Sequence, residues 1–311
     1  MIKFRQVEYF LAVAEALQFT KAAERLFVTQ PTLSHQIAQL EKTIGTPLFD
    51  RIGKSIRLTE AGKLFQTYAA RAIKELEAGQ TALAELEGLV RGTLTIGVIQ
   101  SFSRTLLPPI LGTFIGRYPN VRLRVREMTA AAIEHDLAQG KLDIGIAFAP
   151  AVLAETEVEP ILDERLLLVV GVDHPLARRK SVRLAELHGQ PMALLGSEFS
   201  TRALIDRHFQ AVGAQPDVVC ETNSIEVMFG AVTQSHLATI IPEQSITEGK
   251  NLSFSVLSVH EKAMVRTAAL LWPSRSFRTV AARTFAGMVR ERILARFKKV
   301  PVRKSRAGEP S

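Results

Sequence analysis

The stretch Phe19-Thr-Lys-Ala-Ala-Glu-Arg-Leu-Phe-Val-Thr-Gln-Pro-Thr-Leu-Ser-His-Gln-Ile-Ala38 predicts two short helices joined by a tight turn. Thr20 is placed to cap the first helix and Thr29 the second, and Pro31 falls in the first turn of the second helix. Apolar residues recur at helical spacing and form the inner face of that helix: Leu33, Ile37 and Leu40. The pattern is typical of a helix-turn-helix.

The outward side of the second helix carries short or flexible hydrogen-bonding groups. Such groups suit a helix that lies in a DNA major groove and contacts base edges. The candidate DNA contacts in this unit are Thr20, Gln30, Pro31, Thr32, Ser34, His35 and Gln36. An ordinary helical hairpin with a solvated face is the alternative interpretation.

The flanking residues complete a small domain over residues 2–59. An apolar stripe over 4–16 predicts a supporting helix, and Gly45 is placed to end the second helix of the pair. Beyond it, a short strand pattern around a turn at Gly53 predicts a wing. Three cations of this wing are candidate contacts for phosphates or the minor groove: Arg51, Lys54 and Arg57. A surface hairpin with ordinary charges remains the alternative.

Charge is concentrated at the two ends of the 311-residue chain. Residues 1–59 hold eight Lys/Arg and five Asp/Glu, and residues 290–311 hold eight and two, whereas the middle is near neutral. This distribution favours an anionic partner at the ends. The single cysteine, Cys220, excludes an intrachain disulfide, and no secretory leader or long apolar run is present, so we expect a cytoplasmic protein.

After Thr59, a row of apolar residues at heptad spacing predicts one long helix over 60–91. Its apolar positions alternate in steps of four and three: Phe65, Ala69, Ala72, Leu76, Gly79, Leu83, Leu86 and Val90. Such a heptad seam predicts pairing with the same helix of a second subunit, although its small residues bury little surface. Arg91-Gly92 ends the helix and marks the best domain boundary.

Residues 92–297 alternate strand and helix patterns, which predicts an α/β body with parallel strands. We expect strands at 94–99, 121–127, 142–148, 166–172, 192–195, 218–221, 237–241 and 264–272, and helices at 104–117, 130–139, 201–212, 225–233 and 279–297. Two similar sets predict a bilobed body, with lobe I at about 92–162 and 267–297 and lobe II at about 163–266. The basic tail, 298–311, is expected to be disordered.

Residues at strand-to-helix turns, most of them polar, are the candidates for ligand binding in the cleft between the lobes. They are Ser101, Phe102, Ser103, Thr129, Phe199, Ser200, Thr201, Arg202 and Asn223. Arg202 is expected to bind a carboxylate or similar anion of the ligand. The alternative is that Arg202 only forms an ion pair with a nearby acidic side chain. Each Ser or Thr alone is as well explained as a helix cap.

Signatures of catalysis are missing from the sequence. It contains no Gly-x-Ser-x-Gly elbow, no phosphate-binding Gly-rich loop, no His-Glu-x-x-His and no second cysteine for a zinc site. We therefore expect neither an enzyme nor a cofactor or metal.

With both halves read, residues 2 to about 296 resemble the LysR-type transcriptional regulators. The resemblance is carried by Phe10-Leu-Ala-Val-Ala14, Phe19-Thr-Lys-Ala-Ala23, Thr29-Gln-Pro-Thr-Leu-Ser34, Gln39-Leu-Glu41, Pro47-Leu-Phe-Asp-Arg51 and Leu58-Thr-Glu-Ala-Gly62. Within the family, the chain is similar to the subgroup that regulates cyanate-degradation operons, through 142–150, 197–202 and 221–224.

The resemblance implies an N-terminal all-α winged helix-turn-helix, a dimerising linker helix and a bilobed effector domain of the periplasmic-binding-protein (type 2) class. It also implies assembly into dimers or tetramers, binding to operator DNA, a change in DNA bending when an effector occupies the cleft, and RNA polymerase as a further partner. The effector is expected to be a small anion, because an anion fits Arg202 and the turn hydroxyls. By position, Gln30, Thr32, Ser34 and His35 would face bases, and Arg51 and Lys54 would face phosphates or the minor groove. The resemblance also implies that the effector pocket is lined by Ser101, Ser103, Thr129, Phe148 and Thr201. The alternative function is a cytoplasmic scavenging protein whose first 59 residues serve protein contacts.

Overall fold

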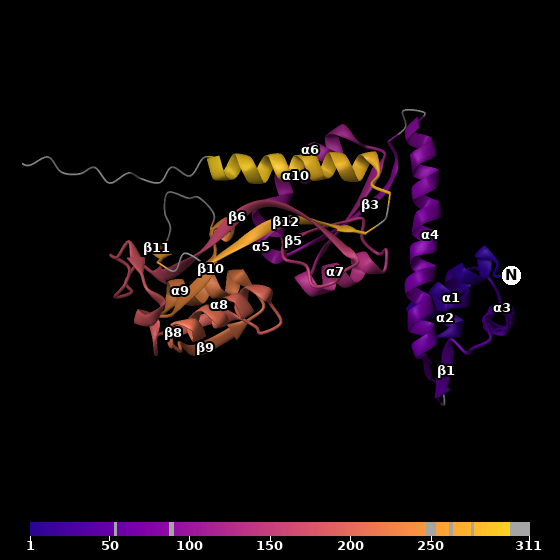
Figure 1. Ribbon diagram of the computed structural model, residues 1–311, viewed down its shortest axis with the longest axis horizontal. Coiled ribbons are helices and arrows are strands. Elements are labelled where there is room, and N and C mark those ends of the chain that lie inside the picture. Colours follow the sequence, from indigo (N-terminus) through magenta and orange to yellow (C-terminus); the bar gives the residue numbers. More distant parts are fainter. Residues whose placement is uncertain (53–54, 87–89, 247–252, 261–263, 275–276, 299–311) are drawn as a thin grey trace, which may run out of the picture.

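A computed structural model of the chain describes residues 1–52, 55–86, 90–246, 253–260, 264–274 and 277–298. Lys54 and nearly all of the basic tail therefore lie outside the described residues. Figure 1 shows a small helical domain on one side of a long upright helix and a larger α/β body on the other side.

The helical domain is built from three helices and a two-stranded hairpin: α1 (Phe4–Ala16), α2 (Phe19–Arg25), α3 (Gln30–Ile44), β1 (Phe49–Ile52) and β2 (Ser55–Leu58). The predicted supporting helix, the helix pair and the wing are therefore confirmed. Aromatic rings fill the centre, with Phe10 5.3 Å from Phe49 and 5.0 Å from Phe65 between ring centroids. Gly45 ends α3 in the left-handed conformation at φ 85°, as expected.

The long helix α4 (Glu60–Leu86) begins after Thr59, whose hydroxyl accepts a hydrogen bond from the Gly62 N–H at 2.9 Å. The predicted cap is thus confirmed. The predicted seam divides into two parts. Its first part packs on the chain's own helical domain, where Ala69 is buried, whereas Leu76 and Leu83 are exposed.

The α4 helix is attached to the α/β body by two polar contacts. The Lys74 Nζ lies 3.0 Å from the Asp143 Oδ1, and the Arg71 Nε donates to the Ala138 carbonyl at 2.8 Å. Gly140, at φ +68°, places its Cα against the same face of α4, where an added Cβ would lie 3.5 Å from the Lys74 Cβ. The α4 helix is therefore held in a defined position on the α/β body.

The α/β body has two lobes joined by two long strands, β6 (Thr156–Gly171) and β12 (Val265–Pro273). Lobe I contains β3 (Gly92–Val98), α5 (Gln100–Thr105), α6 (Leu107–Arg117), β4 (Val121–Glu127), α7 (Ala130–Ala138), β5 (Ile144–Ala149) and the closing α10 (Val280–Lys298). Lobe II contains β7 (Ser181–Val182), β8 (Pro191–Leu195), α8 (Ser200–Ala211), β9 (Asp217–Thr222), α9 (Ile225–Gln234), β10 (Ala238–Pro242) and β11 (Phe254–Val259), with short 3-10 turns at Leu184–Leu187 and Glu243–Ser245.

The strand order β4-β3-β5-β12-β6-β10-β8-β9 places the two connecting strands at the centre. β6 pairs with β12 in lobe I and with β10 and β11 in lobe II. Each lobe has its own core, with Phe114, Trp272 and Phe285 buried in lobe I and Leu168, Met192 and Phe209 in lobe II. The bilobed prediction is confirmed.

Two local predictions were wrong in extent, and two short strands were missed. The helix expected at 104–117 is two helices, because the chain turns into a helix directly after β3 and a second helix starts at Leu107, ahead of Pro108. The strand expected at 166–172 begins ten residues earlier, in a segment whose many charges obscure its alternation. The short strands β7 and β11 were not predicted at all.

No helix in the described part of the chain is both long and apolar enough to cross a membrane.

Candidate functional site

The α3 helix presents a polar face that its own start and core fix in place. The Thr29 hydroxyl accepts from the Thr32 N–H at 3.4 Å, and Pro31 lies in the first turn, so the predicted cap is confirmed. Leu33, Ile37 and Leu40 are buried and hold the helix against α1 and α2. The opposite side of α3 is exposed at Gln30, Pro31, Thr32, His35 and Gln39, while Ser34 and Gln36 are half-buried.

The surroundings of two predicted DNA contacts, Thr20 and Gln36, differ from what the sequence predicts. The α2 helix is preceded by Gln18, so Thr20 lies inside its first turn with an exposed side chain and does not cap it. The Gln36 Oε1 accepts from the Gln6 Nε2 at 3.4 Å, which ties Gln36 to the supporting helix. Thr20 remains at the surface, and Gln36 is turned partly inward.

The wing carries two of the three predicted cations on short paired strands. Arg57 is exposed on β2 and pairs in register with Asp50 of β1. Arg51 belongs to β1, opposite Ile56, and Lys54 lies outside the described residues. α3 and the wing belong to one compact domain, as a winged helix-turn-helix requires.

A buried ion pair lies at the junction of the two lobes, on the connecting strands. Glu164 of β6 and Arg266 of β12 are opposite each other in register, and the Arg266 Nε donates to the Glu164 Oε2 at 3.0 Å. The Glu164 Oε1 accepts from the Gln244 N–H at 2.6 Å. Glu164 is fully buried and Arg266 is only 8% exposed.

The same guanidinium reaches into both lobes. Its two terminal nitrogens donate to the Thr201 Oγ1 at 2.6 Å, in lobe II, and to the Ser101 Oγ at 3.2 Å, in lobe I. Its carbon lies 3.3 Å from the centroid of the Phe148 ring. Arg266 therefore links the first turns of α5 and α8, and it stacks on the Phe148 ring of β5 in lobe I.

Burial shifts the pKa of both members of the pair. Desolvation raises the pKa of the Glu164 carboxyl, against the opposing effects of Arg266 and the Gln244 N–H. Desolvation likewise lowers the pKa of the Arg266 guanidinium to about 10, against the effect of Glu164. Arg266 thus keeps its charge at neutral pH, where it can attract an anion.

Two cavities meet at Arg266. The inner one has a volume of about 30 Å³ and is lined by Ser101, Thr129, Phe199, Ser200, Thr201 and Arg266, among others. The outer one has about 840 Å³ and adds Phe148, Leu204, Arg207 and Val265. The inner cavity has room for a few water-sized atoms, and the outer cavity for a larger, mainly apolar body.

The structure brings together six of the ten predicted effector residues around these cavities: Ser101, Thr129, Phe148, Phe199, Ser200 and Thr201. The other four do not line them. Phe102 is buried against Phe148 in the core of lobe I, the Ser103 hydroxyl bonds to Glu127, and Asn223 is exposed beyond β9.

Arg202 is the fourth, and the structure assigns its charge to neighbours within lobe II. Its Nε lies 2.9 Å from the Asp206 Oδ1, and its Nη1 donates to Glu221 and to the Leu195 carbonyl, each at 2.8 Å. These hydrogen bonds, acting against burial, raise the pKa of Arg202. Of the two interpretations of Arg202, the structure favours pairing with nearby acids.

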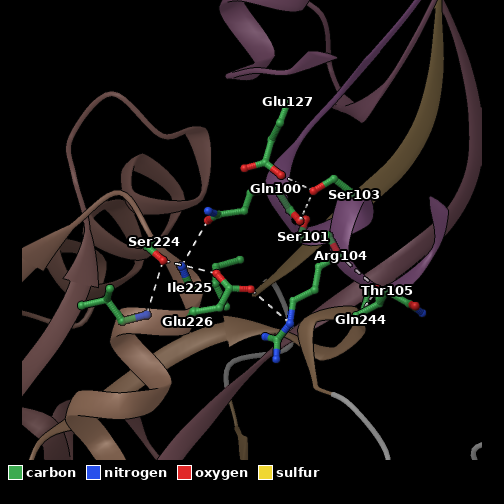
Figure 2. A network of polar contacts seen from close by, with 11 residues as sticks. Gln100, Ser101, Ser103, Arg104, Thr105, Glu127, Ser224, Ile225, Glu226 and Gln244 are labelled. Carbon is green, nitrogen blue, oxygen red and sulfur yellow. Dashed lines mark hydrogen bonds and ion pairs between the residues drawn. The ribbon is translucent and has the colours of Figure 1, made fainter. Parts of the chain in front are cut away.

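A second set of polar contacts joins the lobes along α5 (Figure 2). The Gln100 Oε1 accepts from the Ile225 N–H at 3.2 Å, and the Thr105 hydroxyl donates to the Gln244 carbonyl at 3.0 Å. The Arg104 Nε lies 3.1 Å from the Glu226 Oε1, at the start of α9. The lobes are therefore held closely together beside the inner cavity.

Sequence reasoning missed Arg266 and Glu164. A signal was present, because Arg266 lies in phase with the buried residues Ala268, Leu270 and Trp272 of its strand. A charge on the buried side of a strand needs a partner, and that requirement marks a candidate site.

The described residues include no group of three or more His, Cys, Asp or Glu side chains arranged to hold a metal ion.

Comparisons with known proteins agree with this architecture. Residues 4–63 match the model of the bacterial regulatory helix-turn-helix proteins of the lysR family, and residues 87–294 match the LysR substrate binding domain. The transcriptional activator CmpR of Synechocystis is 30% identical over 281 residues, covering 90% of this chain and 92% of that protein. The Hca operon activator HcaR of Escherichia coli is 32% identical, covering 78% and 82%.

Solved structures share the fold at low identity. Full-length OxyR from Pseudomonas aeruginosa superposes with a TM-score of 0.76 at 21% identity, over 94% of this chain and 95% of that one. CbnR in complex with its target DNA gives 0.54 at 23%, over 94% and 99%. The regulatory domain of CcmR from Synechocystis, in complex with 2-PG, gives 0.60 at 21%, over 65% and 97%.

Proposed function

The chain belongs to the LysR family of ligand-responsive, DNA-binding transcriptional regulators, and we propose that its effector is a small anion bound beside Arg266. The observation that carries this proposal is the buried guanidinium shared by the two lobes. The family membership leaves no support for the alternative of a scavenging protein.

The anion proposal follows from the donors around the inner cavity. Each terminal nitrogen of Arg266 has two N–H groups and donates one of them to a hydroxyl, which leaves a second N–H on each. The hydroxyls of Ser101 and Thr201 are placed to serve as further donors at the same wall. A planar anion such as a carboxylate matches this arrangement, because charge-assisted hydrogen bonds to a guanidinium are strong.

The lining of the outer cavity favours an effector that has a carboxylate and a short apolar body. It is less suited to a bare triatomic anion such as cyanate. Phe148, Phe199, Leu204 and Val265 line it and offer apolar surface directly beside the guanidinium. Cyanate as the effector, and a cyanate operon as the target, remain predictions from the family resemblance. The 2-PG complex of the CcmR regulatory domain supports a small-molecule effector in this type of domain.

A thermal-shift series on the full-length protein tests the effector proposal. Cyanate, formate, acetate and benzoate are compared as sodium salts, and a true effector at about a hundred times its Kd stabilises by about 2.7 kcal/mol. Ser101→Ala removes a hydroxyl at the cavity wall and should weaken the response. Ser103→Ala removes a neighbouring hydroxyl that does not line the cavity and should preserve it. The proposal is contradicted if none of the four anions raises the melting temperature.

For DNA, we propose that α3 contacts base edges through Gln30, Thr32, Ser34 and His35, while Arg51, Lys54 and Arg57 contact phosphates or the minor groove. The exposed polar face of α3 supports this arrangement. Binding should fall on the order of a thousandfold between about 50 and 200 mM salt. Salt-independent binding would count against it.

We also propose that two copies pair through α4, whose Leu76 and Leu83 are 56% and 67% exposed in the single chain. Assembly into tetramers, contact with RNA polymerase and a cytoplasmic location complete the proposal. Light scattering of the full-length protein tests the assembly, and Leu76→Glu with Leu83→Glu should shift it toward the monomer.

A further inference from the structure

Phe27, in the turn of the helix-turn-helix, combines a strained backbone with a side chain that gains no packing. Its φ is +54°, and its relative exposure is 96%. The Phe27 N–H donates to the Glu24 carbonyl at 3.2 Å and the Val28 N–H to the Ala23 carbonyl at 3.1 Å. These two bonds form a Schellman motif after α2, with Phe27 at the position that glycine usually occupies.

The backbone at this position gains nothing from phenylalanine. A residue with a Cβ is disfavoured in the left-handed region, and glycine or asparagine would adopt it more readily. The hydrophobic contact that accompanies such a motif comes from the half-buried Val28, which packs on the core of the domain. Phe27 thus exposes a whole apolar ring to solvent at a strained position, an arrangement that favours a role outside the fold.

The place of Phe27 in the chain favours DNA as the contact. It lies three residues before Gln30, the first residue of α3, and two before its cap, Thr29. In a helix-turn-helix, the N-terminal part of the second helix enters the major groove. The turn that precedes it therefore lies at the rim of the groove, next to deoxyribose rings and thymine methyl groups, and both are apolar.

We propose that Phe27 is a DNA-contact residue whose ring packs against the apolar rim of the major groove, on a thymine methyl or a deoxyribose. This inference rests on α3 lying in the groove. The contact involves no ion pair, so it adds affinity without adding to the salt dependence of binding. It extends the DNA-reading surface beyond α3 and the wing.

Two substitutions separate the strain from the contact. Phe27→Asn removes the ring and relieves the backbone, since asparagine tolerates the left-handed region, whereas Phe27→Ser removes the ring and keeps the strain. Both should weaken binding to an operator selected by the wild-type protein from random duplexes, by about tenfold. Only Phe27→Asn should raise the melting temperature, and both should keep the wild-type salt slope.

The outcomes decide the proposal in distinct ways. Wild-type affinity in both variants overturns it, as does weaker binding in Phe27→Asn alone, which would assign the effect to the backbone. Normal binding with lost transcription in vitro would assign the ring to a protein partner and also overturns it. If the wild-type protein selects no operator, the groove assignment of α3 fails as well.

Operators with uracil in place of thymine distinguish the two DNA groups that the ring could contact. If uracil lowers the affinity of the wild-type protein but not that of the two variants, the contact is a thymine methyl group. If uracil leaves the wild-type affinity unchanged, the contact is the deoxyribose.

Discussion

Arg266 and Glu164 stand opposite each other on the antiparallel strands that join the two lobes, with the Arg266 Nε 3.0 Å from the Glu164 Oε2. The pair lies at the junction of the lobes, because the same guanidinium bonds to Ser101 of lobe I and Thr201 of lobe II. An anion that competes for these donors would change the contacts of both lobes at once. The ion pair is thus both a structural element and the central candidate for signal reception.

Breaking this pair from one side should be costly. Glu164→Gln leaves the Arg266 charge buried without a counter-ion, which we expect to lower the free energy of unfolding by about 3–5 kcal/mol. Replacing both, as Glu164→Leu with Arg266→Met, should restore much of the stability but abolish the response to anions. Glu60→Gln, which removes an exposed pair with Lys63, should cost under about 1 kcal/mol. Chemical denaturation monitors all three, and equal losses in the buried and exposed variants would contradict the role of burial.

The polar face of α3 should control sequence preference. Gln30→Ala is expected to weaken operator binding by about 1–3 kcal/mol, because a lost contact with a base edge costs this much, while binding to random DNA changes little. Gln39→Ala is the matched control, since Gln39 is exposed on the same helix more than two turns further along. Titration of labelled duplexes measures both. A similar loss for Gln39→Ala, or an equal loss on random DNA, would remove Gln30 from base reading.

The close packing of α4 against the chain just before the wing requires glycine at position 62. A Cβ at Gly62 would lie 2.0 Å from the Leu48 carbonyl oxygen, which is backbone and cannot swing away. Gly62→Ala should therefore destabilise the N-terminal domain by about 1–3 kcal/mol or more and weaken DNA binding. Gly112→Ala, in α6, has open space around its Cβ and should stabilise by about 0.5–1 kcal/mol. Thermal unfolding compares them, and a tolerated Gly62→Ala would show that the backbone can shift.

Acid should destabilise lobe II through His174. Burial, and then the charge of His236, lowers the pKa of His174 below its ordinary value of 6.5. Its Nδ1 accepts from the Leu176 N–H at 3.1 Å, a bond that a proton on this nitrogen would remove. The folded state therefore binds the proton less readily than the unfolded state, so the stability from this group is present above pH 6.5 and is lost as the pH falls through the folded-state pKa.

His174→Asn keeps an acceptor near the position of Nδ1 but does not titrate. We expect it to flatten the fall in melting temperature between about pH 7 and pH 5. An unchanged pH profile in this variant would assign the acid sensitivity to other groups.

The sequence alone determined the N-terminal domain nearly to the residue. The predicted helix at 4–16, the cap at Thr29, the end of α3 at Gly45 and the cap at Thr59 are all in the structure. Each depends on residues within a few positions of one another, since helix periodicity and capping are local interactions. The order of strands and helices in the α/β body followed for the same reason.

Only the tertiary structure decided which side chains form the candidate effector site. Ser101, Glu164, Thr201 and Arg266 come from four distant segments and meet only because β6 and β12 run through both lobes. Arg202 had the right chemistry in the sequence, but its helix turns it toward Asp206 and Glu221. Burial then sets the balance of charge, because a guanidinium out of water takes its partners from whatever elements the fold places around it, and no local pattern specifies them.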